Sequence, residues 1–182
     1  MFFNKAILLA FVSALAVQAM PTEDLQATTT NELPEGIITL QTEQMPDGAT
    51  ITIYGVAPGS VSEIPPALER RQQCGTSTNF CEAVHVPAGG PCEELVNSTR
   101  DRPSSLLPAG STSICRDHNG SLCCISWNAP LSNLRQGSLT NAAQITLNRC
   151  VLNQASSGRV TNVELQGNCV VQCLSNRRTG CA

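Results

Sequence analysis

Cysteine is the residue whose chemistry stands out first in this chain. All ten cysteines follow Arg71, and none precedes it. They are Cys74, Cys81, Cys92, Cys115, Cys123, Cys124, Cys150, Cys169, Cys173 and Cys181. An even number at this density is typical of a disulfide scaffold made in an oxidising compartment. We therefore expect five disulfides and no free thiol, in a pairing that the sequence does not choose. Adjacent Cys123 and Cys124 should take different partners, because neighbours in a strand point to opposite faces.

A zinc site is the competing interpretation of the cysteines. Cys169-x3-Cys173 has the spacing of a ligand pair, but both histidines are distant from it in the sequence. Because the expected compartment favours oxidation of thiols, we expect neither a metal nor another cofactor.

An acid–base site is the second chemistry to weigh. His85, His118, Glu93 and Glu94, together with the arginines, could serve a small secreted ribonuclease, which needs a base, an acid and cations around one phosphate. Such an enzyme also stacks nucleobases on aromatic rings, and the chain after Arg71 has one phenylalanine, one tryptophan and no tyrosine. No Gly-x-Ser-x-Gly motif is present. We expect no catalytic residue and keep a hydrolase as the alternative.

The pair Arg70-Arg71 divides the chain into two segments of unlike charge. Residues 20–71 hold eight acidic residues and two arginines, whereas residues 72–182 hold six acidic residues, eight arginines and no lysine. We expect a processing protease of the secretory pathway to cut after Arg71, which gives an acidic propeptide, 20–71, and a mature domain, 72–182. The small positive charge of the mature domain does not favour nucleic acid as a partner.

The N-terminus is typical of a signal peptide. Lys5 precedes an apolar run from Ala6 to Val17, and small residues at Val17 and Ala19 predict cleavage after Ala19. This run is too short to span a membrane, so residues 1–19 are expected to be removed.

The propeptide contains a predicted hairpin. The β-branched stretches 37–40 and 49–54 flank Met45-Pro46-Asp47-Gly48, which is a turn signal. This acidic strand pair could shield part of the mature domain, or it could be a passive spacer, and the sequence leaves both open.

The mature domain is predicted to be α+β: a small, disulfide-rich single domain with an antiparallel sheet and one or two helices. A helix is expected over 91–99, and a second one from Thr140 or Asn141 to Asn148. The predicted strands lie in two hairpins, 111–115 with 122–127 and 160–165 with 169–174.

Two further motifs lie in the mature domain. Asn97-Ser98-Thr99 and Asn119-Gly120-Ser121 are acceptor sequences for N-glycosylation, at Asn97 and Asn119. Arg177-Arg178 is a second dibasic pair, and we interpret it as part of a solvated loop.

Four segments of the mature domain carry a resemblance. They are Cys92-x2-Leu95, Cys123-Cys124-Ile125-Ser126-Trp127, Asn141-Ala142-Ala143-x-Ile145-x4-Cys150 and Gly158-x8-Gly167-x-Cys169. With the signal peptide and the Leu68-Glu69-Arg70-Arg71 site, the chain resembles the precursor of a secreted fungal effector or toxin cut by a kexin-type protease. The mature part is distantly similar to the fungal necrosis-inducing effectors and related killer toxins. The resemblance implies a small α/β sandwich that acts by binding, and it transfers no catalytic residue.

The sequence thus predicts a secreted, cysteine-rich protein that binds a host or competitor protein or surface component. It names no target and leaves open whether the protein acts outside host cells or after uptake into them.

Overall fold

The structure is a computed structural model that describes residues 33–57 and 74–180. The predicted signal-peptide cut at Ala19, the dibasic cut at Arg70-Arg71 and the last cysteine, Cys181, lie outside the described residues. These cleavage sites, and the domain boundaries drawn from them, stay predictions.

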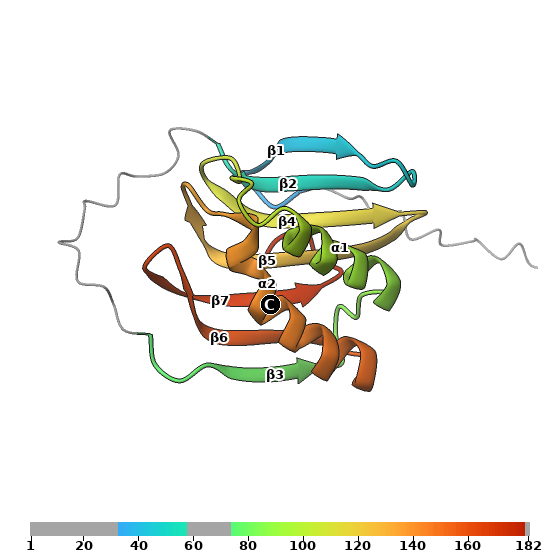
Figure 1. Cartoon of the computed structure of the whole chain (residues 1–182), viewed down its shortest axis with the longest axis vertical. Coiled ribbons are helices and arrows are strands. Elements are labelled where there is room, and N and C mark those ends of the chain that lie inside the picture. The colour runs from blue at the N-terminus through green and yellow to red at the C-terminus, as the bar shows by residue number, and fades with distance from the viewer. Residues whose placement is uncertain (1–32, 58–73, 181–182) are drawn as a thin grey trace, which may run out of the picture. The chain divides into compact units, whose positions relative to one another are not determined.

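Seven strands form one antiparallel sheet in the order β1-β2-β4-β5-β7-β6-β3. In chain order the strands are β1 (Ile37–Gln44), β2 (Thr50–Val56), β3 (Thr78–Glu82), β4 (Ser111–His118), β5 (Ser121–Leu131), β6 (Ser157–Leu165) and β7 (Asn168–Ser175). The helices are α1 (Gly89–Asp101) and α2 (Gln136–Thr146), and α2 continues into a π-helical segment, η1 (Leu147–Leu152). Figure 1 shows both helices on the same side of the sheet. None of the helices among the described residues has the length and apolarity to cross a bilayer.

The expected α+β sandwich is wrong, because the chain is mostly β. The sheet is larger than predicted, since β1 and β2 come from the segment before Arg71, β1 pairs with β2, and β2 pairs with β4. The edge strand β3 was also not predicted. Its sequence, Thr-Asn-Phe-Cys-Glu, has no apolar alternation, and the strand exists because it pairs with β6.

The predicted hairpins of the mature domain are present, and their turns explain why. Asn119 and Gly120 have φ of 53° and 76°, and Gln166 and Gly167 have φ of 52° and 76°. Two consecutive left-handed residues form the type I′ turn that joins twisted antiparallel strands with least distortion. These local signals were sufficient to place the hairpins.

The predicted helix 91–99 lies within α1, whereas the second helix begins earlier than Thr140. Its N-cap is Arg135, and no side chain caps it. Instead the Gln136 N–H donates to the Ser105 carbonyl at 2.9 Å, and the Gly137 N–H donates to the Pro103 carbonyl at 3.2 Å. A loop distant in sequence therefore satisfies the first N–H groups, which usually need a capping side chain.

The main core lies between the helices and the sheet. It includes Trp127, whose indole N–H donates to the Ser111 carbonyl at 2.9 Å, and Leu95 and Leu139 from the two helices. Ile51 and Ile53 of β2 belong to the same core and are each 3% exposed. The segment before Arg71 thus contributes to the same core as the mature domain.

Four disulfides are described. They are Cys74–Cys169, Cys81–Cys150, Cys92–Cys123 and Cys115–Cys124. Cys173 is also disulfide-bonded. Adjacent Cys123 and Cys124 do take different partners: Cys123 ties β5 to α1, and Cys124 ties β5 to β4 on the other side of the sheet.

Candidate binding surface on the helix-free face of the sheet

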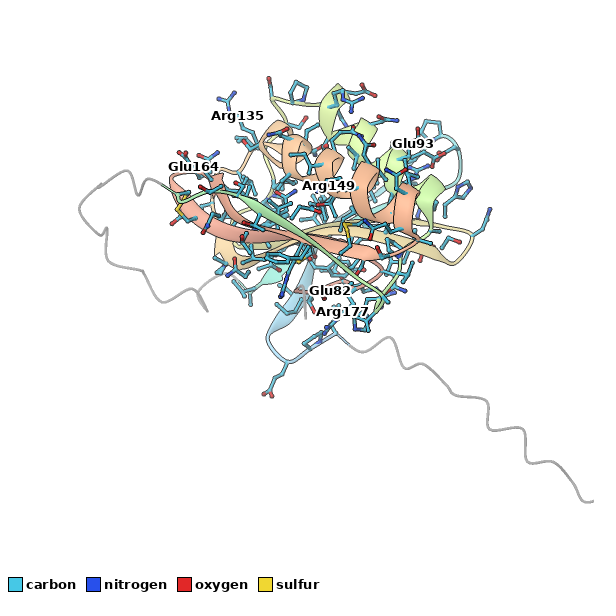
Figure 2. All side chains as sticks on the ribbon, turned by 90° about the horizontal axis from the view of Figure 1, so that it is seen from below. Glu82, Glu93, Arg135, Arg149, Glu164 and Arg177 are labelled. Atoms are coloured by element: carbon cyan, nitrogen blue, oxygen red, sulfur yellow. A yellow bond between two sulfur atoms is a disulfide. The ribbon has the colours of Figure 1, made fainter. Side chains whose placement is uncertain are left out.

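The two faces of the sheet differ in what covers them. The helices cover one face, and we call the other the helix-free face. Figure 2 shows Glu82 and Arg177 on that side of the sheet, away from the helices. Because side chains alternate along a strand, Ile51 and Ile53 point into the core while Thr50, Thr52 and Tyr54 point to the helix-free face.

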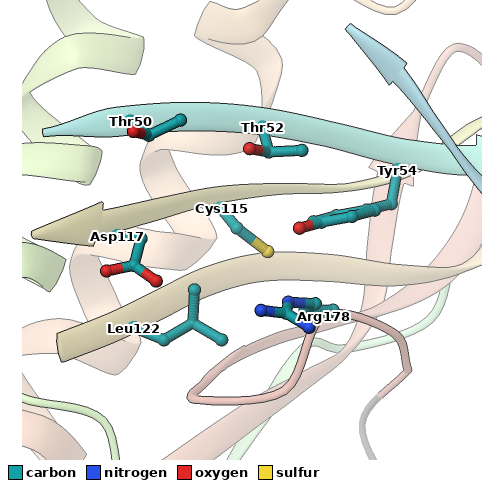
Figure 3. Close-up of a pocket in the computed structure, with 7 residues that line it drawn as sticks. All are labelled: Thr50, Thr52, Tyr54, Cys115, Asp117, Leu122 and Arg178. Carbon is teal, nitrogen blue, oxygen red and sulfur yellow. The ribbon is translucent and has the colours of Figure 1, made fainter. Parts of the chain in front are cut away.

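A pocket of about 200 Å³ lies on this face. Figure 3 shows its lining, which is Thr50, Thr52, Tyr54, Cys115, Asp117, Leu122 and Arg178. The pairing of the strands explains this assembly: Thr50 lies opposite Asp117, Thr52 lies opposite Cys115, and Asp117 lies opposite Leu122. The pocket is therefore built from β2, β4, β5 and the C-terminal loop.

The floor of the pocket is held by a disulfide. Cys115 and Cys124 face each other on β4 and β5, are bonded, and are 1% and 0% exposed. Tyr54 packs with this pair in a small second core, which Leu122 also contacts. A covalent bond and buried neighbours leave this floor little freedom to rearrange.

Polar groups surround the floor. The Asp117 carboxylate accepts a hydrogen bond from the Gly120 N–H at 3.1 Å, which fixes it at the end of the β4–β5 hairpin. The Tyr54 hydroxyl points into the space between Cys115 and Arg178 (Figure 3). The pocket thus presents hydroxyl groups, one carboxylate and one guanidinium.

The C-terminal loop that carries Arg178 is anchored through its backbone. The Ser113 hydroxyl donates to the Arg178 carbonyl, and the Ser126 hydroxyl donates to the Gly180 carbonyl at 2.9 Å. Both serines lie on the helix-free face and are fully buried. The expectation of a merely solvated loop therefore does not hold for Arg178, which lies against the sheet.

A buried arginine links the N-terminal strands to α1. Arg116 of β4 is 2% exposed, and its guanidinium contacts Glu94 at 2.8 Å and 2.6 Å. It also forms an ion pair with Asp47 in the β1–β2 turn. The pKa of Asp47 is lowered, first by the hydrogen bond from the Ala49 N–H at 3.0 Å and then by Arg116. A buried charge needs such partners, because an unpaired one is costly to desolvate.

Comparison with known protein families places most of the chain in a family. Residues 60–181 match the family described as Fungal WD-like. The chain belongs to this family. No curated protein and no solved structure matches the chain. The match and the disulfides confirm a fungal, cysteine-rich protein. The likeness to necrosis-inducing effectors and killer toxins stays a proposal.

In this fungal WD-like chain, the predicted acid–base candidates are not gathered in the pocket. His85 lies in the loop after β3, His118 ends β4, and neither lines the pocket. Glu94 is engaged by Arg116, while Glu93 is exposed on α1. Within residues 33–57 and 74–180, no group of three or more histidine, cysteine or acidic side chains could hold a metal ion.

The residues that sequence reasoning missed are those of β2 and Arg178. The Thr50-x-Thr52-x-Tyr54 alternation was a signal of a two-faced strand, but it lies before the dibasic pair and was assigned to a segment to be removed. No sequence signal placed Arg178 beside it, because that proximity depends on the path of the C-terminal loop.

The two glycosylation motifs have different surroundings. Asn119 is exposed in the β4–β5 turn. Asn97 lies in α1 and accepts a hydrogen bond from Arg100 at 3.1 Å, and Thr99 of its motif is buried against Thr140 at 3.0 Å. Modification of both asparagines stays a prediction, and Asn119 is the better exposed of the two.

Proposed function

We propose that this protein is a secreted recognition protein that binds a host or competitor component outside the producing cell, as an effector or toxin does. The observation that carries the proposal is the helix-free face, where a disulfide-held polar pocket contains neither histidine. Rigid scaffolds that present polar groups on an exposed face are suited to binding, whereas general acid–base catalysis needs its groups within hydrogen-bond reach of one substrate.

The size of the pocket limits what it can bind. Pockets for small molecules usually enclose about 300–1,000 Å³, and this pocket encloses about 200 Å³. It suits one protruding polar group, such as a side chain of a target protein or a sugar hydroxyl cluster of a surface component. Asp117 and Arg178 would supply charged hydrogen bonds to that group, and Tyr54 would supply a hydroxyl and a ring.

The proposal includes secretion and processing. Removal of residues 1–19 after Ala19 would deliver the chain to the secretory pathway, and a kexin-type protease would cut after Arg71. The four described disulfides support passage through an oxidising compartment. Action at the surface of the target cell and action after uptake both fit this route.

A matched pair of variants tests the binding surface. Arg178→Gln removes a charge that lines the pocket, and Arg177→Gln removes the adjacent charge, which does not line it. The purified, labelled protein should bind to cells of a candidate host or competitor, and cell death or an altered immune response should accompany binding. We expect Arg178→Gln to weaken both readouts and Arg177→Gln to leave them near the wild-type level.

A ribonuclease activity is the result that would contradict the recognition proposal. Hydrolysis of RNA by the purified protein, abolished by His85→Ala or His118→Ala, would establish a small secreted ribonuclease and overturn the recognition proposal. Equal target binding by the Arg178→Gln and Arg177→Gln variants would remove the pocket from the binding surface.

A further inference from the structure

The N-terminal hairpin, β1 and β2 (residues 37–56), lies outside the family match yet inside the sheet. The match begins at residue 60, whereas β2 is the second of the seven strands and lies between β1 and β4. We propose that the edge of β4 is a strand-binding site, and that the hairpin stays bound there after the chain is cut at Arg71. The mature protein is then a noncovalent complex of two chains. This inference rests on the proposed processing.

The backbone contacts are those of a continuous sheet. The register of β2 on β4 runs from Thr50 opposite Asp117 to Gly55 opposite Ser111. The Val56 N–H then donates to the Gly110 carbonyl at 3.1 Å. Loss of the hairpin would leave the N–H and C=O groups along this edge of β4 unpaired, and an exposed edge of this kind binds other strands.

The apolar contacts of β2 are those of an interior strand. Ile51 and Ile53 are each 3% exposed, and Ala49, which precedes the strand, is 0% exposed. Ile51 and Ile53 pack in the main core, which also holds Ile114 of β4, and Leu40 and Met45 of the hairpin pack partly buried against it. Release of the hairpin would expose this part of the core to water, so burial of apolar area opposes release.

Two ion pairs add to this contact. Asp47 pairs with buried Arg116, and both oxygens of the Glu43 carboxylate accept hydrogen bonds from Arg102, at 3.1 Å and 2.8 Å. If the hairpin left, Arg116 would keep Glu94 as its remaining described acidic partner. The acidic character of the N-terminal segment is thus matched to arginines of the mature domain.

The candidate pocket gives the retained hairpin a role. Three of its lining residues, Thr50, Thr52 and Tyr54, lie on β2. The pocket is therefore incomplete in a mature domain that has lost the hairpin. Retention of the cut segment keeps the binding surface whole, which deepens the function proposed above.

Cleavage after Arg71 would leave no covalent bond between the two chains. Hydrolysis of the bond between Arg71 and Gln72 consumes one water and leaves a carboxylate on Arg71 and an amine on Gln72. The segment before Arg71 has no cysteine, so no disulfide can hold it. Its retention therefore depends wholly on the backbone pairing, the apolar contacts and the two ion pairs of the hairpin.

The test uses the folded protein, residues 20–182 with its disulfides intact, in which Arg177→Gln removes the second dibasic pair and leaves Arg70-Arg71 as the cleavage site. A protease specific for paired basic residues cuts it in vitro, and size-exclusion chromatography followed by native mass spectrometry gives the composition. We expect the two fragments to elute together at one to one under native conditions and to separate in denaturant. Elution of a folded 72–182 fragment without the N-terminal fragment would overturn the inference.

A matched pair of variants assigns retention to the β2 contact. Ile53→Asp places a charge in the core and should release the fragment after the cut. Thr42→Asp, on the exposed side of β1, should retain it. If Ile53→Asp prevents folding before the cut, the wild-type chromatogram still decides the question.

The result does not depend on processing in the cell. If the secreted protein proves uncut, the proposed processing fails, yet the in vitro cut still tests retention. If the enzyme does not reach the dibasic pair, replacing residues 60–66 with the recognition sequence of a site-specific protease supplies the same break. If cells cut after Arg71 and secrete a folded domain without the hairpin, processing stands and the inference fails.

Discussion

Truncation of one side chain of β2 tests whether the N-terminal hairpin unfolds together with the mature domain. Ile53 is 3% exposed and lies in the main core. Ile53→Ala removes three carbon atoms, which at about 0.8 kcal/mol per buried methylene costs about 2.4 kcal/mol. The cavity left behind raises the expected loss to about 3 kcal/mol in the free energy of unfolding.

The assay is urea unfolding of residues 20–182 with the disulfides intact, followed by circular dichroism. With a slope of roughly 2 kcal/mol per molar urea, the midpoint of Ile53→Ala should fall by about 1.5 M. The matched control is Ile38→Ala on β1. Ile38 is 38% exposed, so its truncation should cost less than about 1 kcal/mol.

The unfolding of the two variants can contradict the view that β2 unfolds together with the rest of the core. If Ile53→Ala and Ile38→Ala both left the main transition unchanged, or if the hairpin unfolded in a separate earlier transition, then β2 would not belong to the cooperative unit. The reasoning that joins the hairpin to the core would then be refuted.

Three further predictions follow from the same contacts. The pKa of Asp47 is lowered, first by the hydrogen bond from the Ala49 N–H and then by the buried guanidinium of Arg116. The ionised carboxylate therefore stabilises the folded state at pH values above 3.8, the usual pKa of the group. This contribution is lost as the pH falls through the lowered pKa. Acid unfolding from pH 5 downward should therefore show a flatter pH dependence for Asp47→Asn than for the wild type, and equal slopes would contradict this. Replacing both Cys92 and Cys123 by serine should reduce the free energy of unfolding by roughly 2–4 kcal/mol, measured by denaturant titration, and no loss would show that this bridge is dispensable. After separation in denaturant, the secreted fragment that holds the cysteines should begin at Gln72, and an earlier dominant start of that fragment would contradict cleavage after the dibasic pair.

The sequence by itself determined the local elements. The two-residue turn at Asn119-Gly120 needs two left-handed residues, which asparagine and glycine supply, and it therefore predicted the β4–β5 hairpin. The helix expected over 91–99 and the hairpin expected around Asp47 were read from local patterns in the same way. The even number of cysteines, all of which follow Arg71, indicated a disulfide scaffold without any knowledge of the fold.

Only the tertiary structure decided how these elements combine. The pairing of β2 with β4, the ion pair of Arg116 with Asp47 and the position of Arg178 beside Tyr54 join residues that are far apart in the sequence. None of these contacts can be recognised from a local sequence pattern. Each depends on which apolar faces pack against each other and on which buried charge needs a partner. The dibasic pair marks a boundary in the sequence. The fold includes residues on both sides of that boundary, because Ile51 and Ile53 are buried in the same core as the residues that follow it.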